Sequence, residues 1–270
     1  GTRFIAASLL LGTIVLLVKG PRAFTVTAPQ VRGAMFMGVT ILGVAIGIVT
    51  LAVRYVPTGI AALIASVLPL WIILFRLRAG DRPSRLTLIG VGMGLIGLFL
   101  ILIPGGTVPI SGASNAQVAL WSVAIACGSF CWAFFSWRST SYQQPKNPLT
   151  TAVIQLATAG VFLALVGVLI GETWNFGIIT QQSWAGWAFL VFASSAAYGA
   201  YVWLINNAPM SLVTTHAYVN PMVAVTLGFF ILKEPISLDV VVGLSIVVGG
   251  VALVVNGERR TRQLLVEPPQ

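Results

Sequence analysis

A cluster of polar side chains interrupts an otherwise apolar stretch near the end of the chain. Its members are Thr214, Thr215, His216, Tyr218 and Asn220. On a helix, His216 and Asn220 share one face because they are four residues apart. Pro221 follows at once and has no amide hydrogen, so it leaves the carbonyl of Ala217 without its helical donor. The pattern indicates either a small-molecule site or hydrogen bonds from His216 and Asn220 to a neighbouring helix.

Other apolar stretches carry isolated groups of the same kind. Pro69 should open the carbonyl of Ala65 in the same way, and Ser66 lies next to that carbonyl. Tyr198 and Trp132 lie deep in two further apolar stretches, where a tyrosine hydroxyl needs a hydrogen-bond partner. We predict Pro69 and Pro221 as flexible kinks. The predicted substrate-binding residues are Ser66, Trp132, Tyr198, His216, Tyr218 and Asn220.

Catalytic and metal-binding motifs are not recognisable in the sequence. There is one histidine, no HExxH motif and no pair of carboxylates inside an apolar stretch. Cys127 and Cys131 are four residues apart, but they lack the His or Asp partners of a metal site. We therefore predict that the protein is not an enzyme and binds no metal or cofactor.

Glycines recur at helical spacing in two apolar stretches. The run from Gly92 to Gly97 fits GxGxxG, but it lies inside an apolar stretch and not at a strand-to-helix turn, which argues against dinucleotide binding. Glycines four residues apart instead let the backbone of a neighbouring helix come close inside a membrane. The predicted packing positions are Gly43, Gly47, Gly90, Gly94 and Gly97.

The composition predicts that membrane-spanning helices position all of these residues. Hydrophobic residues make up 57% of the 270 positions and charged residues 8%, against roughly 25% charged residues in a soluble protein. About 20 apolar residues in a helix cross the hydrocarbon core of a bilayer. We predict an all-α membrane protein whose spans cover residues 4–18, 33–53, 57–75, 86–104, 117–137, 149–170, 185–205, 210–231 and 238–255.

Basic residues are concentrated in alternate loops between the predicted spans. Twelve of the fifteen Lys and Arg residues fall in the segments 19–32, 76–85, 138–146 and 259–262. By the positive-inside rule these loops face the cytoplasm, which also places the C-terminus there. The formal net charge of +9 is thereby explained without a nucleic-acid partner.

The two halves of the chain repeat each other at an offset of 152 residues. Pro57, Pro69 and Pro83 correspond to Pro209, Pro221 and Pro235. The apolar stretches align at the same offset, except that the span 117–137 has no partner in the first half. We predict two repeats, at 1–104 and 117–255, with a cytoplasmic tail at 256–270. We also expect a helix before residue 1 in the intact protein. That gives ten helices, of which nine are present here, in two inverted five-helix repeats.

These residues resemble a known family of transporters. The second half is similar to the end of an EamA-type repeat through Asn220-Pro221, Lys233-Glu234-Pro235, Leu238 and Gly249-Gly250. The first half is similar through Leu68-Pro69, Asp81-Arg82-Pro83 and Gly97, and the opening Arg3-Phe4 with Ala6-Ala7 resembles the second helix of that repeat. The chain is thus identified as a member of the drug/metabolite transporter superfamily. It departs from the pattern where Arg82 stands in place of the acidic Glu234.

The resemblance implies a ten-helix exporter of small metabolites such as amino acids, with a central cavity and alternating access. The spans 33–53, 57–75, 185–205 and 210–231 would surround that cavity. We expect a multi-pass protein of a bacterial inner membrane, with a small-molecule substrate and the lipid bilayer as its partners. A monomer is compatible with these patterns. Alternatives are a facilitative uniporter or drug exporter of the same fold, and a scaffold subunit that transports nothing.

Overall fold

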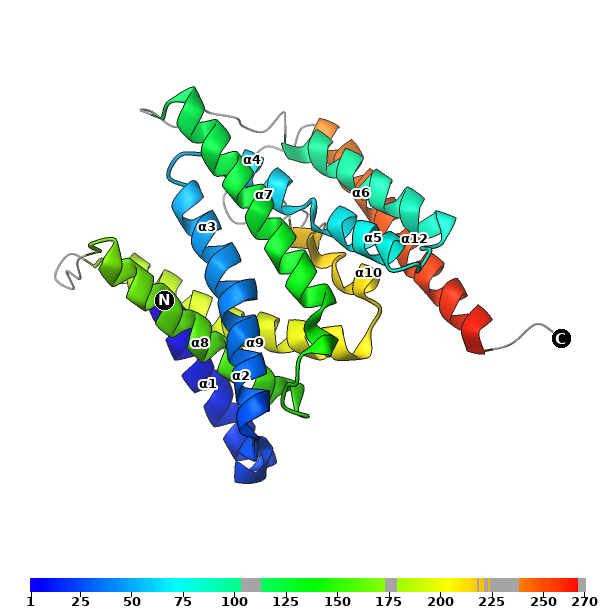
Figure 1. Ribbon diagram of the computed structural model, residues 1–270. Coiled ribbons are helices and arrows are strands. Elements are labelled where there is room, and N and C mark those ends of the chain that lie inside the picture. Colours follow the sequence, from blue (N-terminus) through cyan, green and yellow to red (C-terminus); the bar gives the residue numbers. More distant parts are fainter. Residues whose placement is uncertain (103–112, 173–178, 218, 221–222, 224–237, 267–270) are drawn as a thin grey trace. The chain divides into compact units, whose positions relative to one another are not determined.

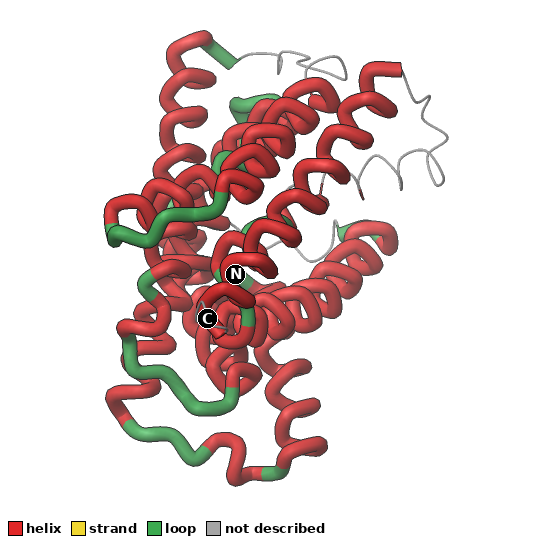
Figure 2. Tube along the Cα trace, turned by 90° about the vertical axis from the view of Figure 1, so that its right-hand side faces the viewer, coloured by secondary structure: helices red, strands yellow, loops and turns green. Residues whose placement is uncertain are grey.

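The computed structural model is built from helices. It describes residues 1–102, 113–172, 179–217, 219–220, 223 and 238–266, and within these residues it contains helices and loops but no strand (Figure 2). The predicted all-α fold class is confirmed. The helices are α1(Thr2–Lys19), η1(Pro21–Phe24), α2(Ala28–Met37), η2(Gly38–Val44), α3(Ala45–Ala52), α4(Thr58–Ala65), α5(Leu68–Arg78), α6(Arg85–Leu102), α7(Asn115–Trp137), η3(Ser139–Ser141), α8(Pro148–Leu169), α9(Gln181–Asn207), α10(Met210–Val213) and α12(Leu238–Val266) (Figure 1).

Local signals in the sequence account for several helix ends. The side chain of Gln30 accepts a 3.0 Å hydrogen bond from the backbone amide of Thr27, just before α2. Asn147 caps α8, because its Oδ1 accepts from the amide of Leu149 at 3.2 Å. At the other end of α1, Gly20 adopts a φ of 74°, which suits a glycine.

Six helices in the described residues are long and apolar enough to cross a membrane. They cover Thr2–Lys19, Ala28–Ala52, Asn115–Trp137, Pro148–Leu169, Gln181–Asn207 and Val241–Arg259. Large apolar side chains point outward from several of them: Leu17 is 79% exposed, Leu169 84% and Phe189 71%. An apolar exterior of this kind requires lipid as its surroundings.

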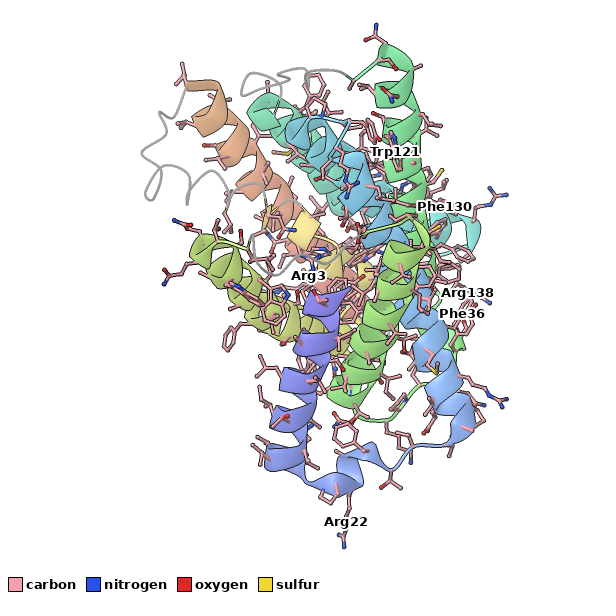
Figure 3. All side chains as sticks on the ribbon, turned by 90° about the vertical axis from the view of Figure 1, so that its left-hand side faces the viewer. Arg3, Arg22, Phe36, Trp121, Phe130 and Arg138 are labelled. Atoms are coloured by element: carbon pink, nitrogen blue, oxygen red, sulfur yellow. The ribbon has the colours of Figure 1, made fainter. Side chains whose placement is uncertain are left out.

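The chain divides into two compact units. Unit 1 contains Gly1–Gly47 and Arg138–Asn207, and unit 2 contains Ile48–Trp137 and Ala208–Gln270. In unit 1, α1 packs along α8 and α9. The backbones of α1 and α8 lie close together, because a Cβ placed on Gly160 would lie 2.7 Å from the amide nitrogen of Ile5. Arg22, in η1 after α1, points away from α1 and α2 (Figure 3).

Unit 2 has its closest helix pair in α6 and α12. A Cβ on Gly90 would lie 2.5 Å from the carbonyl oxygen of Gly250, and one on Gly97 would lie 2.6 Å from that of Gly243. A Cβ on Gly250 would in turn lie 2.8 Å from the amide of Gly94. These glycines let the two backbones touch, and Val91, Val247 and Val254 fill the space beside them.

Gly43 and Gly47 serve a different purpose from the one expected. The nearest atoms to a Cβ on Gly43 belong to the ring of Phe162, at 2.7 Å, and those for Gly47 to the side chain of Leu163, at 2.9 Å. Both neighbours are side chains of α8. The nearest atoms at these two glycines are therefore side chains of the neighbouring helix, for which the glycines make room.

Several predicted spans differ from the observed helices. The span 33–53 corresponds to one continuous helical run, α2–η2–α3, which covers Ala28–Ala52 and whose middle is a π-helix. The span 57–75 is split into α4 and α5, because the helix ends at Ala65 and a new one begins at Leu68. The segment expected as a tail from 256 onward instead begins inside α12, which continues to Val266. Most of the span 210–231 lies outside the described residues.

The α6–α12 contact allows a matched test. We expect Gly90→Ala to lower the thermal denaturation midpoint in detergent, because the added methyl group meets the carbonyl of Gly250. Gly92→Ala, on the same helix, has nothing within 4 Å of its new Cβ. It should leave the midpoint unchanged or raise it, since alanine favours a helix over glycine by roughly 1 kcal/mol. Equal effects of the two substitutions would contradict the close α6–α12 contact.

Candidate functional site

Tyr198, one of the predicted substrate-binding residues, lies among polar and aromatic side chains. It lies on α9 in unit 1 and is 6% exposed. Its hydroxyl donates a 2.7 Å hydrogen bond to Oε1 of Gln155 on α8. Its ring stacks on that of Tyr201, with centroids 5.9 Å apart. A polar and aromatic cluster is thus held between two helices that cross the membrane.

The backbone of unit 1 fixes the position of Gln155. A Cβ on Gly38 would lie 2.5 Å from the carbonyl oxygen of Gln155, so glycine is needed where the π-helix η2 passes α8. π-Helical turns are rare and often occur at functional sites. On the neighbouring turns, Ser8 donates to the carbonyl of Val153 at 2.9 Å, which ties α1 to α8. The cluster therefore rests on a rigid frame.

Gln155 is a residue that the sequence analysis missed. It is 3% exposed and is the one amide side chain in α8. The signal was present, because a polar residue inside a membrane span is costly and is usually functional. It was not recognised because Gln155 has no proline, histidine or second polar residue beside it in the sequence.

Ser66 lies in unit 2, at the break between α4 and α5. Its hydroxyl donates to the carbonyl of Ala62 at 2.7 Å and lies 3.4 Å from the carbonyl of Ala217. Nearby, the hydroxyl of Ser129 on α7 donates to the carbonyl of Ala65 at 3.3 Å. Serine hydroxyls thus reach the carbonyls of Ala65 and Ala217, which stand four residues before Pro69 and Pro221, where no amide donor is available.

The remaining predicted residues have varied surroundings. In unit 2, His216 is half-buried and its Nδ1 lies 2.9 Å from the carbonyl oxygen of Val213. Trp132 on α7 packs against a buried cluster that includes Leu68 and Phe75. Asn220 is exposed. Tyr218 and Pro221 lie outside the described residues.

The structure brings some of these residues together. Ser66 and His216 belong to the same part of unit 2, since Ser66 reaches the residue that follows His216. Aromatic rings gather beside them on α5 and α7, where Phe130 lies 5.2 Å from Trp71 and 5.4 Å from Phe75, centroid to centroid. Figure 3 shows Phe130 and Trp121 on different turns of α7. Tyr198 belongs to the other unit.

A second polar cluster in unit 2 was also missed. Nη1 of Arg76, in the last turn of α5, lies 2.7 Å from Oε1 of Glu258 on α12, and the two side chains are 11% and 7% exposed. Nε of the same arginine lies 2.7 Å from Oδ2 of Asp81, and Nη1 also donates to the hydroxyl of Ser211 on α10. The hydroxyl of Thr87 on α6 donates to Glu258 at 3.2 Å. Four helices therefore meet at one buried ion pair.

This ion pair joins segments that the charge pattern assigns to one side of the membrane. The segment 76–85, the start of α10 and the end of α12 come together within unit 2. The proximity of these three segments agrees with the predicted alternation of spans, which places all three on the same side of the membrane. That this side is the cytoplasmic one stays a prediction.

Comparison with known proteins decides the family. The model of the EamA-like transporter family matches residues 1–103 and 119–256. The chain belongs to the EamA-like transporter family. It is therefore a multi-pass membrane transporter of the drug/metabolite transporter type, as the resemblance of its motifs implied.

Individual relatives agree with this assignment. The chain is 33% identical, over 264 residues, to the uncharacterized inner membrane transporter YedA of Escherichia coli (strain K12), covering 96% of this chain and 81% of that protein. It is 23% identical, over 202 residues, to the uncharacterized transporter YyaM of Bacillus subtilis (strain 168), covering 73% of this chain and 64% of that protein. A crystal structure with 20% sequence identity matches with a TM-score of 0.75, over 96% of this chain and 87% of that one. At that identity the match supports the fold alone.

The buried ion pair makes a stability prediction for this EamA-like protein. Arg76→Met leaves the carboxylate of Glu258 without a cation, a loss typically of about 3–5 kcal/mol. Glu258→Gln should cost less, because Arg76 keeps its contact with Asp81. Replacing both by Met should lower the denaturation midpoint less than Arg76→Met alone. A double variant that is as unstable as the sum of the two single variants would show that the pair is not coupled.

Proposed function

We propose that this chain exports small amphipathic metabolites, most simply amino acids or related compounds, by alternating access. The family supports transport. The observation that carries the substrate class is the buried Tyr198–Gln155 pair, with the ring of Tyr201 beside it, inside membrane-spanning helices. Neutral polar groups next to rings suit a compact solute that has both a polar end and an apolar side chain.

We assign the proposed substrate contacts in each unit separately. In unit 1 the proposed substrate contact is Tyr198. In unit 2 the proposed contacts are Ser66, Trp132, His216, Tyr218 and Asn220. The serine hydroxyls at the break between α4 and α5 support this choice, because broken helices are where secondary transporters place their substrates.

The charged side chains argue against two other substrate classes. Phosphorylated substrates call for Lys or Arg deep in a span. The buried arginine of unit 2, Arg76, lies in the last turn of α5 and is occupied by two carboxylates. Cationic drugs call for a membrane carboxylate, and Glu258, the carboxylate of the buried cluster, already carries Arg76 as its counter-ion.

Orientation and membrane belong to the same proposal. We place the chain in a bacterial inner membrane with its C-terminus in the cytoplasm, because twelve of fifteen basic residues fall in the loops that would then be cytoplasmic. The direction of transport, outward, follows the family resemblance.

Transport in proteoliposomes tests the proposal. Liposomes containing the purified protein are loaded with labelled amino acids, and efflux is followed with and without a pH gradient. We expect Tyr198→Phe to slow efflux on the order of tenfold, the effect of one hydrogen bond of about 1.4 kcal/mol. A pH effect that disappears in His216→Ala would assign proton coupling to that side chain, and no pH effect would favour a facilitator.

Tyr142→Phe provides the matched control. Tyr142 lies in the loop before α8, with its ring 5.3 Å from that of Phe36, and the substitution preserves this ring contact. Efflux in this variant should equal that of the wild type. If Tyr198→Phe, His216→Ala and Asn220→Ala all fold and transport at the wild-type rate, these residues are structural and the substrate site lies elsewhere. A protein that moves no solute of a broad panel would support the scaffold alternative.

A further inference from the structure

A continuous chain of hydrogen bonds runs through unit 1 from a loop to Tyr198. It begins at Ser139, whose carbonyl oxygen accepts from Nε2 of Gln144 at 2.8 Å. Oε1 of Gln144 then accepts from Nε2 of Gln155 at 2.9 Å. The hydroxyl of Tyr198 completes the chain by donating to Oε1 of Gln155 at 2.7 Å.

The first member of the chain sets the direction of every bond in it. A backbone carbonyl can only accept, so Gln144 must turn its NH₂ group toward Ser139 and its oxygen toward Gln155. Gln155 must therefore present its own NH₂ group to Gln144 and its oxygen to Tyr198. The hydrogen of the Tyr198 hydroxyl is then committed to Gln155, and the phenol oxygen keeps its capacity to accept.

We propose that this chain makes Tyr198 an obligatory hydrogen-bond acceptor toward the substrate, so that it selects an ammonium or N–H group over a carbonyl or carboxylate. This inference rests on the proposed function and specifies which end of the solute Tyr198 contacts. Among the described residues, no group donates a hydrogen bond to the Tyr198 oxygen. A substrate ammonium would supply that donor. Gln144 and Gln155 act as positioning residues, since they reach the substrate only through Tyr198.

Burial keeps the direction of the chain fixed. Gln155 is 3% and Tyr198 6% exposed, so rotating one amide would leave buried polar atoms facing unsuitable partners, which is costly. Rotation of Gln155 alone would place NH₂ opposite the hydroxyl at one end and oxygen against the oxygen of Gln144 at the other. The amides of Gln144 and Gln155 can therefore rotate only together. The Ser139 carbonyl, which can only accept, prevents that rotation.

The internal repeat carries this chain of hydrogen bonds in one half only. At the offset of 152 residues, Tyr198 corresponds to Ile46 and Gln155 to Arg3. The first repeat therefore has neither the phenol nor the amide at the equivalent positions.

A single substitution outside the spans reverses the chain. Lysine at position 144 can only donate, so in Gln144→Lys it would donate to the Ser139 carbonyl and to the oxygen of Gln155. The amide of Gln155 would then turn its NH₂ group toward Tyr198, and the hydroxyl would be free to donate to a substrate carbonyl. Gln144→Glu can only accept, and it leaves the direction at Tyr198 unchanged.

Two probes with one carbon skeleton measure the preference. L-Leucine and 4-methyl-2-oxopentanoate differ in having an ammonium or a carbonyl at the same carbon. In proteoliposomes we expect the wild type and Gln144→Glu to favour leucine. In Gln144→Lys the leucine-to-oxoacid efflux ratio should fall on the order of tenfold, the effect of exchanging one favourable hydrogen bond.

Two controls separate this effect from the added charge. Gln143→Lys places the same charge on the exposed neighbouring residue, outside the chain, and should leave the ratio unchanged. Adding Tyr198→Phe should remove the difference between Gln144→Lys and the wild type. An equal fall in the ratio with Gln143→Lys, or a fall that persists without the Tyr198 hydroxyl, would overturn the proposal.

A spectroscopic measurement decides the matter even if the substrate class is wrong. The Raman ring doublet of tyrosine distinguishes a phenol that donates from one that accepts, and subtracting the spectrum of Tyr198→Phe isolates the signal of Tyr198. We expect a donor signature in the wild type and an acceptor signature in Gln144→Lys. An acceptor signature in the wild type refutes the inference. A donor signature in a protein that moves neither probe refutes only the amino-acid substrate.

Discussion

A peptide group that crosses hydrocarbon must find its hydrogen-bond partner within the protein, because an unpaired one costs several kcal/mol. The rest of this structure follows from that constraint. The constraint requires helices throughout the spans. Wherever a helix is interrupted, the backbone groups released there need other hydrogen-bond partners. At Ala65 and Ala217 the residue four positions later is a proline, and in each case a serine hydroxyl reaches the exposed carbonyl. At the break between α4 and α5, the hydroxyl of Ser129 stands in for the amide donor that Pro69 lacks.

The same constraint governs side chains, and it gives their hydrogen bonds a direction. Arg76 and Glu258 can be buried because each satisfies the other, with Asp81 and Thr87 completing the set. A set of side chains that satisfy one another holds helices together, but it leaves no donor or acceptor for a ligand. The chain that ends at Tyr198 is different, because its last oxygen still has the capacity to accept. In a dry interior, such remaining capacity is the basis for recognition.

Sequence patterns predicted the structural features that many residues specify together. Each long span is a run of 18 or more mostly apolar residues, so its existence was clear, and the glycines of α6 lie against the backbone of α12. Features that depend on a single pair were missed. Arg76 and Glu258 are 182 positions apart, and nothing near either residue indicates the other. Gln155 is one amide in an apolar helix, and its meaning appears only when α9 places a hydroxyl 2.7 Å away.

The repeat explains why the fold was easier to predict than the site. Prolines and glycines recur at the offset of 152 residues because both halves must solve the same backbone problem. Side chains at the equivalent positions do not recur: Ser66 corresponds to Tyr218 and Ile46 to Tyr198. The backbone is thus constrained equally in both halves, whereas the side chains are not. The positions where the repeats differ in side chain are therefore the ones to examine for function.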